Sequence, residues 1–134
     1  MDQDVVIIDM EFEHPLKKYK YFNFLIRGWE KNVYEKRSLL GINASVFLIR
    51  NCEWSMDFME RWSMMGPQNP QYESFAKILA DELPDRAITE SNDQSSLVYV
   101  MIKEKEKWGG KIYIENEYFF QGYWLDIFRT FEYQ

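Results

Sequence analysis

Short apolar runs divide the chain into segments that are typical of strands. Three of these runs predict strands at Val5–Ile8, Phe22–Ile26 and Ile42–Ile49. Their apolar residues are nearly continuous rather than alternating, which is typical of strands that are covered on both faces. A further strand is predicted at Lys111–Glu115. None of the runs approaches the roughly 18 apolar residues that a membrane-spanning helix needs.

Helical spacing fills the stretches between these strands. Apolar residues four positions apart, at Trp54, Phe58 and Trp62, predict a helix with Asn51 as its N-cap. Further helices are predicted at Tyr72–Leu83, from residue 91 to about Lys107, and at Trp124–Phe128. Because strands alternate with helices, the pattern indicates an α/β fold.

The composition limits the class of protein. The chain has 134 residues, with 16 Lys and Arg against 22 Asp and Glu, so its net charge is −6. This length fits one domain, and the acidic balance argues against a nucleic-acid partner. With 46% hydrophobic and 18% aromatic residues, the chain is not of the disordered class. One cysteine and one histidine leave no internal disulfide and exclude most self-contained zinc sites.

Two carboxylates, Asp2 and Asp4, stand directly before the first apolar run. Both can reach one hard cation, which prefers oxygen ligands and can bind a diphosphate at the same time. Such an ion neutralises charge on a departing phosphate. The spacing alone is common, and the ordinary interpretation is an acidic chain terminus.

Polar residues at two further places are candidates for binding a substrate. Asn92, Asp93 and Gln94 open the third predicted helix, where free N–H groups and the helix dipole stabilise a carboxylate; ordinary helix capping is the alternative. Asn43 leads into a buried strand, so its amide needs partners, and it either lines a site or ties a loop. The charged run Lys103–Lys107 is predicted to be a solvated helix face.

Longer words of the sequence resemble one known family. FLIRNC, WSMDFM and SMMGPQ are similar to plant glycosyltransferase family 34, which includes xyloglucan α-1,6-xylosyltransferases and galactomannan α-1,6-galactosyltransferases. The resemblance starts at MDQD and continues in unbroken order through GINASVFLIRNCEWSMDFMERWSMMGPQNPQYE and ESNDQSSLVYVMIKEKEKW. It ends with KIYIENEYFFQGYW, which is closer to the galactomannan branch, and it covers essentially all 134 residues.

The resemblance implies that residues 1–134 form the central part of one GT-A glycosyltransferase domain, a Rossmann-like α/β fold with a mixed sheet flanked by helices. It implies a retaining enzyme that transfers xylose or galactose from UDP-xylose or UDP-galactose, with Mn²⁺ as cofactor. The implied acceptor is a polysaccharide, a β-1,4-glucan or mannan backbone that receives an α-1,6 branch in hemicellulose biosynthesis. The implied location is the Golgi lumen, with a type II membrane anchor expected upstream of this chain.

The resemblance also assigns roles to individual residues. Asp2 and Asp4 fall on the family's Asp-x-Asp motif, which holds the metal ion between the two phosphates of the UDP-sugar. Asn92, Asp93 and Gln94 fall on the family's Asp-Asp-Gln motif beside the anomeric carbon and the acceptor. A carboxylate there stabilises positive charge on the sugar, as carboxylates do in glycosidases.

The sequence departs from the family pattern at several positions. Asn43 falls on an Asn-Ala-Gly or Asn-Thr-Gly turn that faces the site, but Ser45 replaces the glycine, which strains the turn if the backbone there needs a positive φ. Asn92 replaces the first acid of Asp-Asp-Gln, and Arg27 replaces the usual histidine before Gly-Trp. The family's C-terminal histidine, which completes the metal site, is expected beyond this chain, and His14 does not match it.

Three hypotheses about function remain at this point. The first is a glycosyltransferase of this family, which we adopt. The second is a catalytically inactive remnant, or an interaction module that forms homo- or hetero-oligomers with full-length family members. The third is an unrelated carbohydrate-binding α/β domain that uses its aromatic residues without a metal ion.

Overall fold

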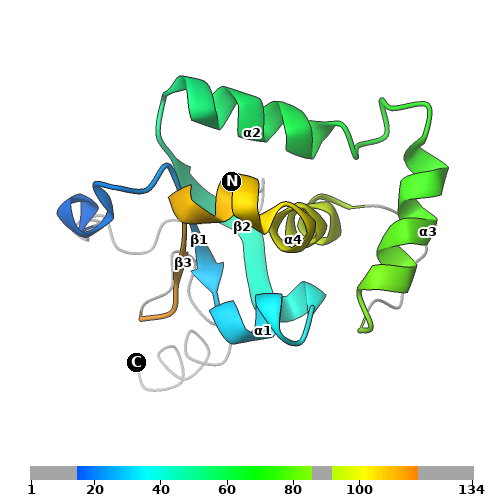
Figure 1. The fold of residues 1–134 in the computed structure, drawn as a ribbon, viewed down its shortest axis with the longest axis horizontal. Helices are drawn as coiled ribbons and strands as arrows, with labels where there is room; N and C mark the ends of the chain where they lie inside the picture. The colour runs from blue at the N-terminus through cyan, green and yellow to red at the C-terminus, as the bar shows by residue number, and fades with distance from the viewer. Residues whose placement is uncertain (1–14, 86–91, 118–134) are drawn as a thin grey trace, which may run out of the picture.

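The computed structural model describes residues 15–85 and 92–117, which form a small sheet with helices packed against it (Figure 1). The described strands are β1 (Phe24–Gly28), β2 (Ile42–Ile49) and β3 (Ile112–Glu115). β1 lies between the other two, antiparallel to β2 and parallel to β3. The α/β fold with a mixed sheet flanked by helices, as the resemblance implies, is therefore confirmed.

The strands follow the apolar runs with small differences. β2 has its predicted boundaries, whereas β1 begins two residues later than predicted, because the N–H of Phe22 donates to Tyr19 in a turn. β1 is buried along its whole length, as expected for a covered strand. β2 is not, since it lies at the edge of the described sheet and only Ile42 and Ala44 in it are buried. The predicted strand at Val5–Ile8 lies outside the described residues.

Five helices are described: α1 (Glu30–Tyr34), α2 (Glu53–Ser63), α3 (Tyr72–Glu82), α4 (Asp93–Lys103) and α5 (Lys105–Trp108). Short 3-10 turns are described at η1 (Leu16–Tyr19), η2 (Leu39–Gly41) and η3 (Gly109–Lys111). In Figure 1, α4 (yellow) lies between α2 above it and α1 below it.

α1 was not predicted, because five residues are too few to show a helical period. The prediction of Asn51 as the cap of α2 is wrong, since Cys52 holds that position and makes no side-chain cap bond. The helix predicted at Trp124–Phe128 lies outside the described residues.

The helix predicted to continue to about residue 107 is interrupted at Glu104. The backbone of Glu104 leaves the helical region, with φ −117° and ψ 32°, and this residue ends α4 and precedes α5. Its carboxylate accepts hydrogen bonds from Arg61 of α2 (Nε–Oε2 2.7 Å) and from the indole N–H of Trp108 (3.1 Å). The charged run is therefore not entirely a solvated face, because Glu104 ties α2 to the junction of α4 and α5.

Aromatic side chains fill the space between the sheet and α2. Phe58 is fully buried at the centre, with its ring centroid 5.1 Å from that of Phe24, 5.1 Å from that of Trp54 and 5.3 Å from that of Trp108. Phe47 of β2 and Trp62 of α2 extend this cluster toward the start of α4. For these residues, the high aromatic content is explained by core packing.

Two glycines bring the end of β1 against the turn that precedes β2. A Cβ at Gly28 would lie 2.3 Å from the carbonyl oxygen of Gly41, which already accepts a hydrogen bond from the N–H of Trp29. Since this backbone oxygen cannot move aside as a flexible side chain can, Gly28→Ala is expected to lower the free energy of unfolding by about 1–3 kcal/mol. Urea unfolding followed by tryptophan fluorescence measures the loss. Gly110→Ala is the matched control, because nothing lies within 4 Å of a Cβ built there; equal losses in both variants would contradict the steric explanation.

Candidate functional site

The first turn of α4 contains the three residues that the sequence predicts to be catalytic. Asn92 is the N-cap of the helix, and its side-chain oxygen accepts a hydrogen bond from the N–H of Ser95 at 2.7 Å. The carbonyl of Asn92 also accepts a hydrogen bond from the hydroxyl of Ser96 at 2.7 Å. Asn92 therefore fixes the start of α4, which is the role that the capping interpretation assigns to it.

Asp93 follows with an exposed side chain on a firmly held backbone. Its carboxylate accepts the N–H of Gln94 at 2.9 Å. Its carbonyl accepts the indole N–H of Trp62 at 2.9 Å, and the same N–H lies 3.1 Å from the hydroxyl of Ser96. The buried ring of Trp62 thus holds the backbone from which the only carboxylate of this turn projects.

Gln94 connects this turn to the sheet. Its side-chain oxygen accepts a hydrogen bond from the N–H of Ala44 at 3.3 Å, and its side-chain nitrogen donates to the carbonyl of Leu39 at 2.8 Å. Both ends of the amide are therefore used to fasten α4 to the start of β2 and to η2. This contact brings the Asn92–Gln94 segment beside Asn43, the chain neighbour of Ala44.

Asn43 is exposed and holds its own turn together. Its side-chain oxygen accepts hydrogen bonds from the N–H of Ser45 at 3.0 Å and from the hydroxyl of Ser45 at 2.6 Å. The register between β1 and β2 shifts at this point, since Ile26 pairs with Phe47 but Arg27 pairs with Asn43. Ser45 does not have a positive φ, because the only described non-glycine residue with one is Arg37. The serine therefore carries no strain of the kind expected from the loss of glycine.

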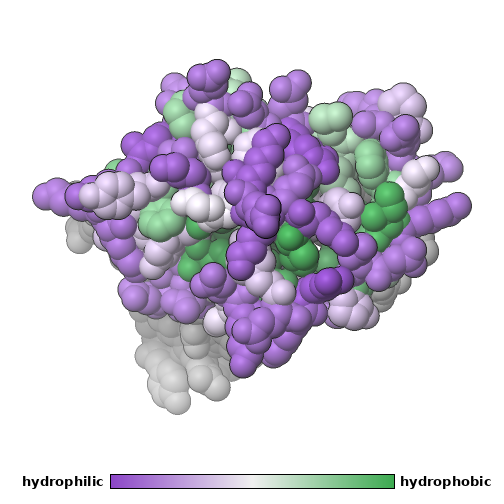
Figure 2. Space-filling view, viewed as in Figure 1, coloured by the Kyte–Doolittle hydropathy of each residue, from purple (hydrophilic) through white to green (hydrophobic). Residues whose placement is uncertain are grey.

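A pocket of about 280 Å³ opens between the end of α2 and the start of α4. We call it the α2–α4 pocket. Its lining comprises Phe47, Met59, Trp62, Ser63, Met65, Gly66, Pro67, Gln68, Asn92, Asp93 and Ser96. Apolar residues also reach the surface between the polar side chains on the face seen in Figure 2. Two of the predicted site residues, Asn92 and Asp93, therefore border a mainly apolar hollow.

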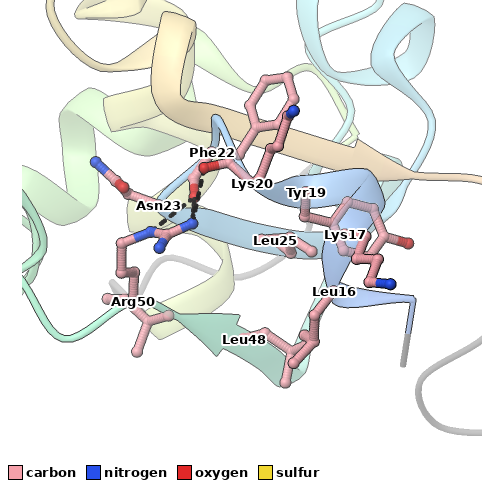
Figure 3. A pocket seen from close by; sticks show the side chains of 10 residues that line it. Leu16, Lys17, Tyr19, Lys20, Phe22, Asn23, Leu25, Leu48 and Arg50 are labelled. Atoms are coloured by element: carbon pink, nitrogen blue, oxygen red, sulfur yellow. Dashed lines mark hydrogen bonds between the residues drawn. The ribbon is translucent and has the colours of Figure 1, made fainter. Parts of the chain in front are cut away.

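A second pocket, of about 440 Å³, has a different lining (Figure 3). It lies between η1, the beginning of β1 and the end of β2, and Lys17, Lys20 and Arg50 contribute its positive charges. The guanidinium of Arg50 donates to the carbonyl oxygens of Lys20 at 2.9 Å and Phe22 at 3.3 Å. Because none of the predicted site residues that the structure describes, namely Asn43, Asn92, Asp93 and Gln94, lines this pocket, it is not the candidate site.

A buried ionic cluster, which the sequence did not predict, lies at the carboxyl ends of β1 and β3. Arg27 donates to the backbone carbonyl of Glu115 at 2.8 Å. Burial lowers the pKa of the Arg27 guanidinium, although the negative charge of Glu115 acts to raise it. The carboxylate of Glu115 accepts hydrogen bonds from Tyr19, from Lys18 at 3.1 Å and from the N–H of Glu117 at 2.7 Å. Burial alone would raise the pKa of Glu115, but these hydrogen bonds outweigh it and hold the pKa below its ordinary value. Only one sign of this pair is visible in the sequence: Glu115 ends one apolar run, and Arg27 ends another.

The predicted metal ligands, Asp2 and Asp4, lie outside the described residues, as does His14. Within residues 15–85 and 92–117, no three His, Cys, Asp or Glu side chains come together in a way that could hold a metal ion. Across the same residues, no helix has both the length and the apolar character needed to cross a membrane.

The fold and this site define an α/β domain with polar residues gathered where a helix begins beside the ends of the strands, a common place for ligands in such folds. Residues 1–124 match the galactosyl transferase GMA12/MNN10 family. The chain therefore belongs to this family of glycosyltransferases.

Several curated relatives agree with this assignment. Probable glycosyltransferase 6 of Oryza sativa subsp. indica is 51% identical over 127 residues, which are 95% of this chain and 26% of the relative. Galactomannan galactosyltransferase 1 of Cyamopsis tetragonoloba is 47% identical over 133 residues, 98% of this chain and 31% of the relative. Probable xyloglucan 6-xylosyltransferase 1 of Oryza sativa subsp. indica is 44% identical over 124 residues, 92% and 28% of the two chains. The chain thus spans less than a third of the length of each of these three relatives.

Trp62 and Phe47, which line the α2–α4 pocket, were not predicted as parts of the site. Both residues were assigned to apolar faces only. An indole on a buried helix face usually finds a partner for its N–H, so Trp62 could have been expected to bind a neighbouring backbone. The identity of that partner, the carbonyl of Asp93, depends on helix packing, which the sequence does not display.

Proposed function

We propose that the whole protein is a retaining glycosyltransferase that moves xylose or galactose from UDP-xylose or UDP-galactose to a polysaccharide acceptor. The acceptor is a β-1,4-glucan or mannan backbone, and the product carries an α-1,6 branch. The names of two relatives, a galactomannan galactosyltransferase and a xyloglucan 6-xylosyltransferase, support galactose and xylose as the sugars transferred and a galactomannan or a xyloglucan as the polysaccharide. In this proposal residues 1–134 are the central part of one GT-A domain located in the Golgi lumen.

One observation carries the proposal furthest. The hydrogen bonds of Gln94 to Ala44 and Leu39 join the two segments in which the resemblance places site residues, although they are about 50 residues apart in the sequence. At this junction Asp93 has an exposed carboxylate that can stabilise positive charge on the anomeric carbon of the donor sugar. Asn43 and Asn92 add exposed amide groups beside it.

The proposed metal site consists of Asp2 and Asp4. Two carboxylates suit a hard cation such as Mn²⁺, which would lie against the diphosphate of the UDP-sugar. When bound, the ion supplies positive charge where the diphosphate departs. The described residues offer no observation in favour of an inactive interaction module or of an oligomer with related glycosyltransferases, so the proposal includes neither.

Asp4→Ala is expected to abolish the Mn²⁺-dependent binding of UDP, because it removes one of the two proposed carboxylate ligands. Calorimetric titration of UDP into the chain, with Mn²⁺ and then with a chelator, measures the effect. Asp57→Ala is the matched control, since Asp57 is exposed on α2 and does not line the α2–α4 pocket. UDP binding that is independent of the metal, or equal loss in the two variants, would contradict the assignment.

A further inference from the structure

The segment Asn43-Ala44-Ser45 is an acceptor sequence for N-linked glycans, because a serine stands two residues after the asparagine and no proline lies between them. No other asparagine of the chain is followed by serine or threonine at that distance. The family pattern has a glycine where this chain has Ser45, so the acceptor sequence is a feature of this chain and not of that pattern. The proposed function gives no role to the hydroxyl of Ser45.

The side chain of Asn43 projects away from the core. Asn43 is exposed, whereas its neighbours in β2, Ile42 and Ala44, are 3% and 5% exposed. Successive side chains of a strand point to opposite faces, which explains this alternation. An N-linked glycan is bulky and hydrated, and therefore needs an attachment point on the surface. Asn43 meets this requirement in the folded chain.

The two polar atoms of the Asn43 side chain differ in the hydrogen bonds that they make. The oxygen accepts from the N–H of Ser45 at 3.0 Å and from the hydroxyl of Ser45 at 2.6 Å. The nitrogen Nδ2 donates no hydrogen bond to any part of the chain that the structure describes. Nδ2 is the atom to which an N-linked glycan is bonded, so attachment breaks none of the hydrogen bonds that hold this turn.

We infer that Asn43 is a site of N-linked glycosylation. The substrate is an oligosaccharide carried on a lipid diphosphate, and the catalyst is the oligosaccharyltransferase that acts on chains entering the secretory pathway. Nδ2 forms a bond to C1 of the first sugar and loses one proton, while the bond between C1 and the diphosphate oxygen breaks and the lipid diphosphate leaves. The inference rests on the proposed function only for the lumenal location of the chain.

Glycosylation at this position changes the candidate site. The hydrogen bond from the N–H of Ala44 to Gln94 brings Asn43 beside the first turn of α4. A glycosylated chain carries a sugar on the amide that the proposed function places beside Asp93, and no longer presents that amide to a donor sugar or a polysaccharide. Glycosylation of Asn43 and use of its free amide therefore exclude each other in one molecule.

Cell-free translation with microsomes tests the inference, using the whole chain behind a cleavable secretion signal. The sample is treated with protease, and only protected chains, which have entered the lumen, are analysed. We expect a band of higher mass that peptide N-glycosidase removes. Because this enzyme converts a glycosylated asparagine to aspartate, peptide mass spectrometry then shows whether position 43 was modified.

Four variants define the acceptor. Asn43→Gln and Ser45→Ala are both expected to lose the heavier band completely, although Ser45→Ala keeps the acceptor nitrogen and removes only the hydroxyl. Ser45→Thr keeps a hydroxyl and is expected to keep the band. Glu53→Ser is the matched positive control, because it creates a second acceptor sequence at Asn51, which is also exposed. This variant is expected to carry two glycans.

The geometry also predicts that the folded chain accommodates the glycan. The chain secreted from insect cells carries the glycan, whereas the same chain produced in bacteria does not. We expect the urea midpoint of unfolding to be at least as high in the glycosylated chain, because attachment at Nδ2 breaks no hydrogen bond of the described residues and fills no buried space.

Protected chains without a glycan at Asn43 overturn the inference, and so does a glycan on Asn51 alone in the Glu53→Ser variant. A lower urea midpoint in the glycosylated chain overturns the conclusion that the fold accommodates the glycan at Nδ2. If the chain from bacteria shows Mn²⁺-dependent UDP binding but Asn43 is not glycosylated, only this inference is wrong. If Asn43 is glycosylated but UDP does not bind, this inference holds and the transferase assignment fails.

Discussion

Phe58→Ala is expected to lower the free energy of unfolding by about 3–5 kcal/mol, the cost of removing a large aromatic side chain from a packed core. Phe58 is fully buried and its ring contacts those of Phe24, Trp54 and Trp108. The neighbouring rings come from β1, α2 and α5, so a cavity at this point loosens three elements at once. Because domains of this size are stable by only about 5–15 kcal/mol, the variant is expected to be largely unfolded on mild heating.

Urea unfolding followed by tryptophan fluorescence measures this change, since all five tryptophans of the chain remain in the variant. Met56→Ala on the same helix is the matched control, because the side chain of Met56 is 67% exposed. It is expected to change the free energy of unfolding by no more than about 0.5 kcal/mol. A similar loss in Met56→Ala would show that the effect comes from helix propensity or from expression conditions and not from the aromatic core.

Glu115→Gln is expected to lower the free energy of unfolding by about 2–4 kcal/mol at neutral pH. This value lies between the cost of leaving a buried hydrogen-bonding group without a partner and the cost of breaking a buried ion pair. The fully buried carboxylate accepts hydrogen bonds from Lys18, from Tyr19 and from the N–H of Glu117. An amide cannot accept all three, because its nitrogen is itself a donor. The loss is expected to detach η1 from β3 first, as those hydrogen bonds link the two elements.

The same carboxylate makes stability depend on pH. The pKa of Glu115 in the folded chain lies below its ordinary value of 4.5. The contribution of this carboxylate to the free energy of unfolding is therefore complete above about pH 4.5, and it is lost as the pH falls through the pKa of the folded chain. The difference in unfolding free energy between the unaltered chain and Glu115→Gln should therefore shrink on acidification. Urea titrations at a series of pH values test this, with Glu73→Gln on the exposed surface of α3 as the control. A difference that stays constant down to pH 2 would show that the variant acts through packing alone.

Local pattern was enough to locate most elements. The apolar run from Ile42 to Ile49 predicted the boundaries of β2, because the run of apolar residues begins and ends with the strand. The apolar spacing before Pro84 predicted α3, because the spacing shows the helical period and the proline stops the helix. The break of α4 at Glu104 was not predictable, since it depends on Arg61 and Trp108, which reach that carboxylate only in the folded chain. α1 has too few residues to show a period.

The candidate site was predicted as separate residues and not as a place. Asn43 and Asp93 could be named from their motifs, but nothing local shows that Gln94 binds the backbone beside Asn43. Such a contact depends on how α4 packs on β2, which is a property of the whole domain. The wall that Phe47 and Trp62 give to the α2–α4 pocket was hidden for a similar reason, because a core aromatic and a binding aromatic have the same spacing on a helix or strand.

The way Gln94 is attached has a consequence for how the family diverges. Its amide binds main-chain atoms of Ala44 and Leu39, which every residue type except proline at position 44 would provide in the same place. Substitutions in the turn from Asn43 to Ser45 can therefore alter the chemistry presented to a ligand without releasing the turn from α4. The attachment of this turn to α4 therefore does not depend on the side chains that the turn carries, and Ser45, which has no positive φ, causes no backbone strain there.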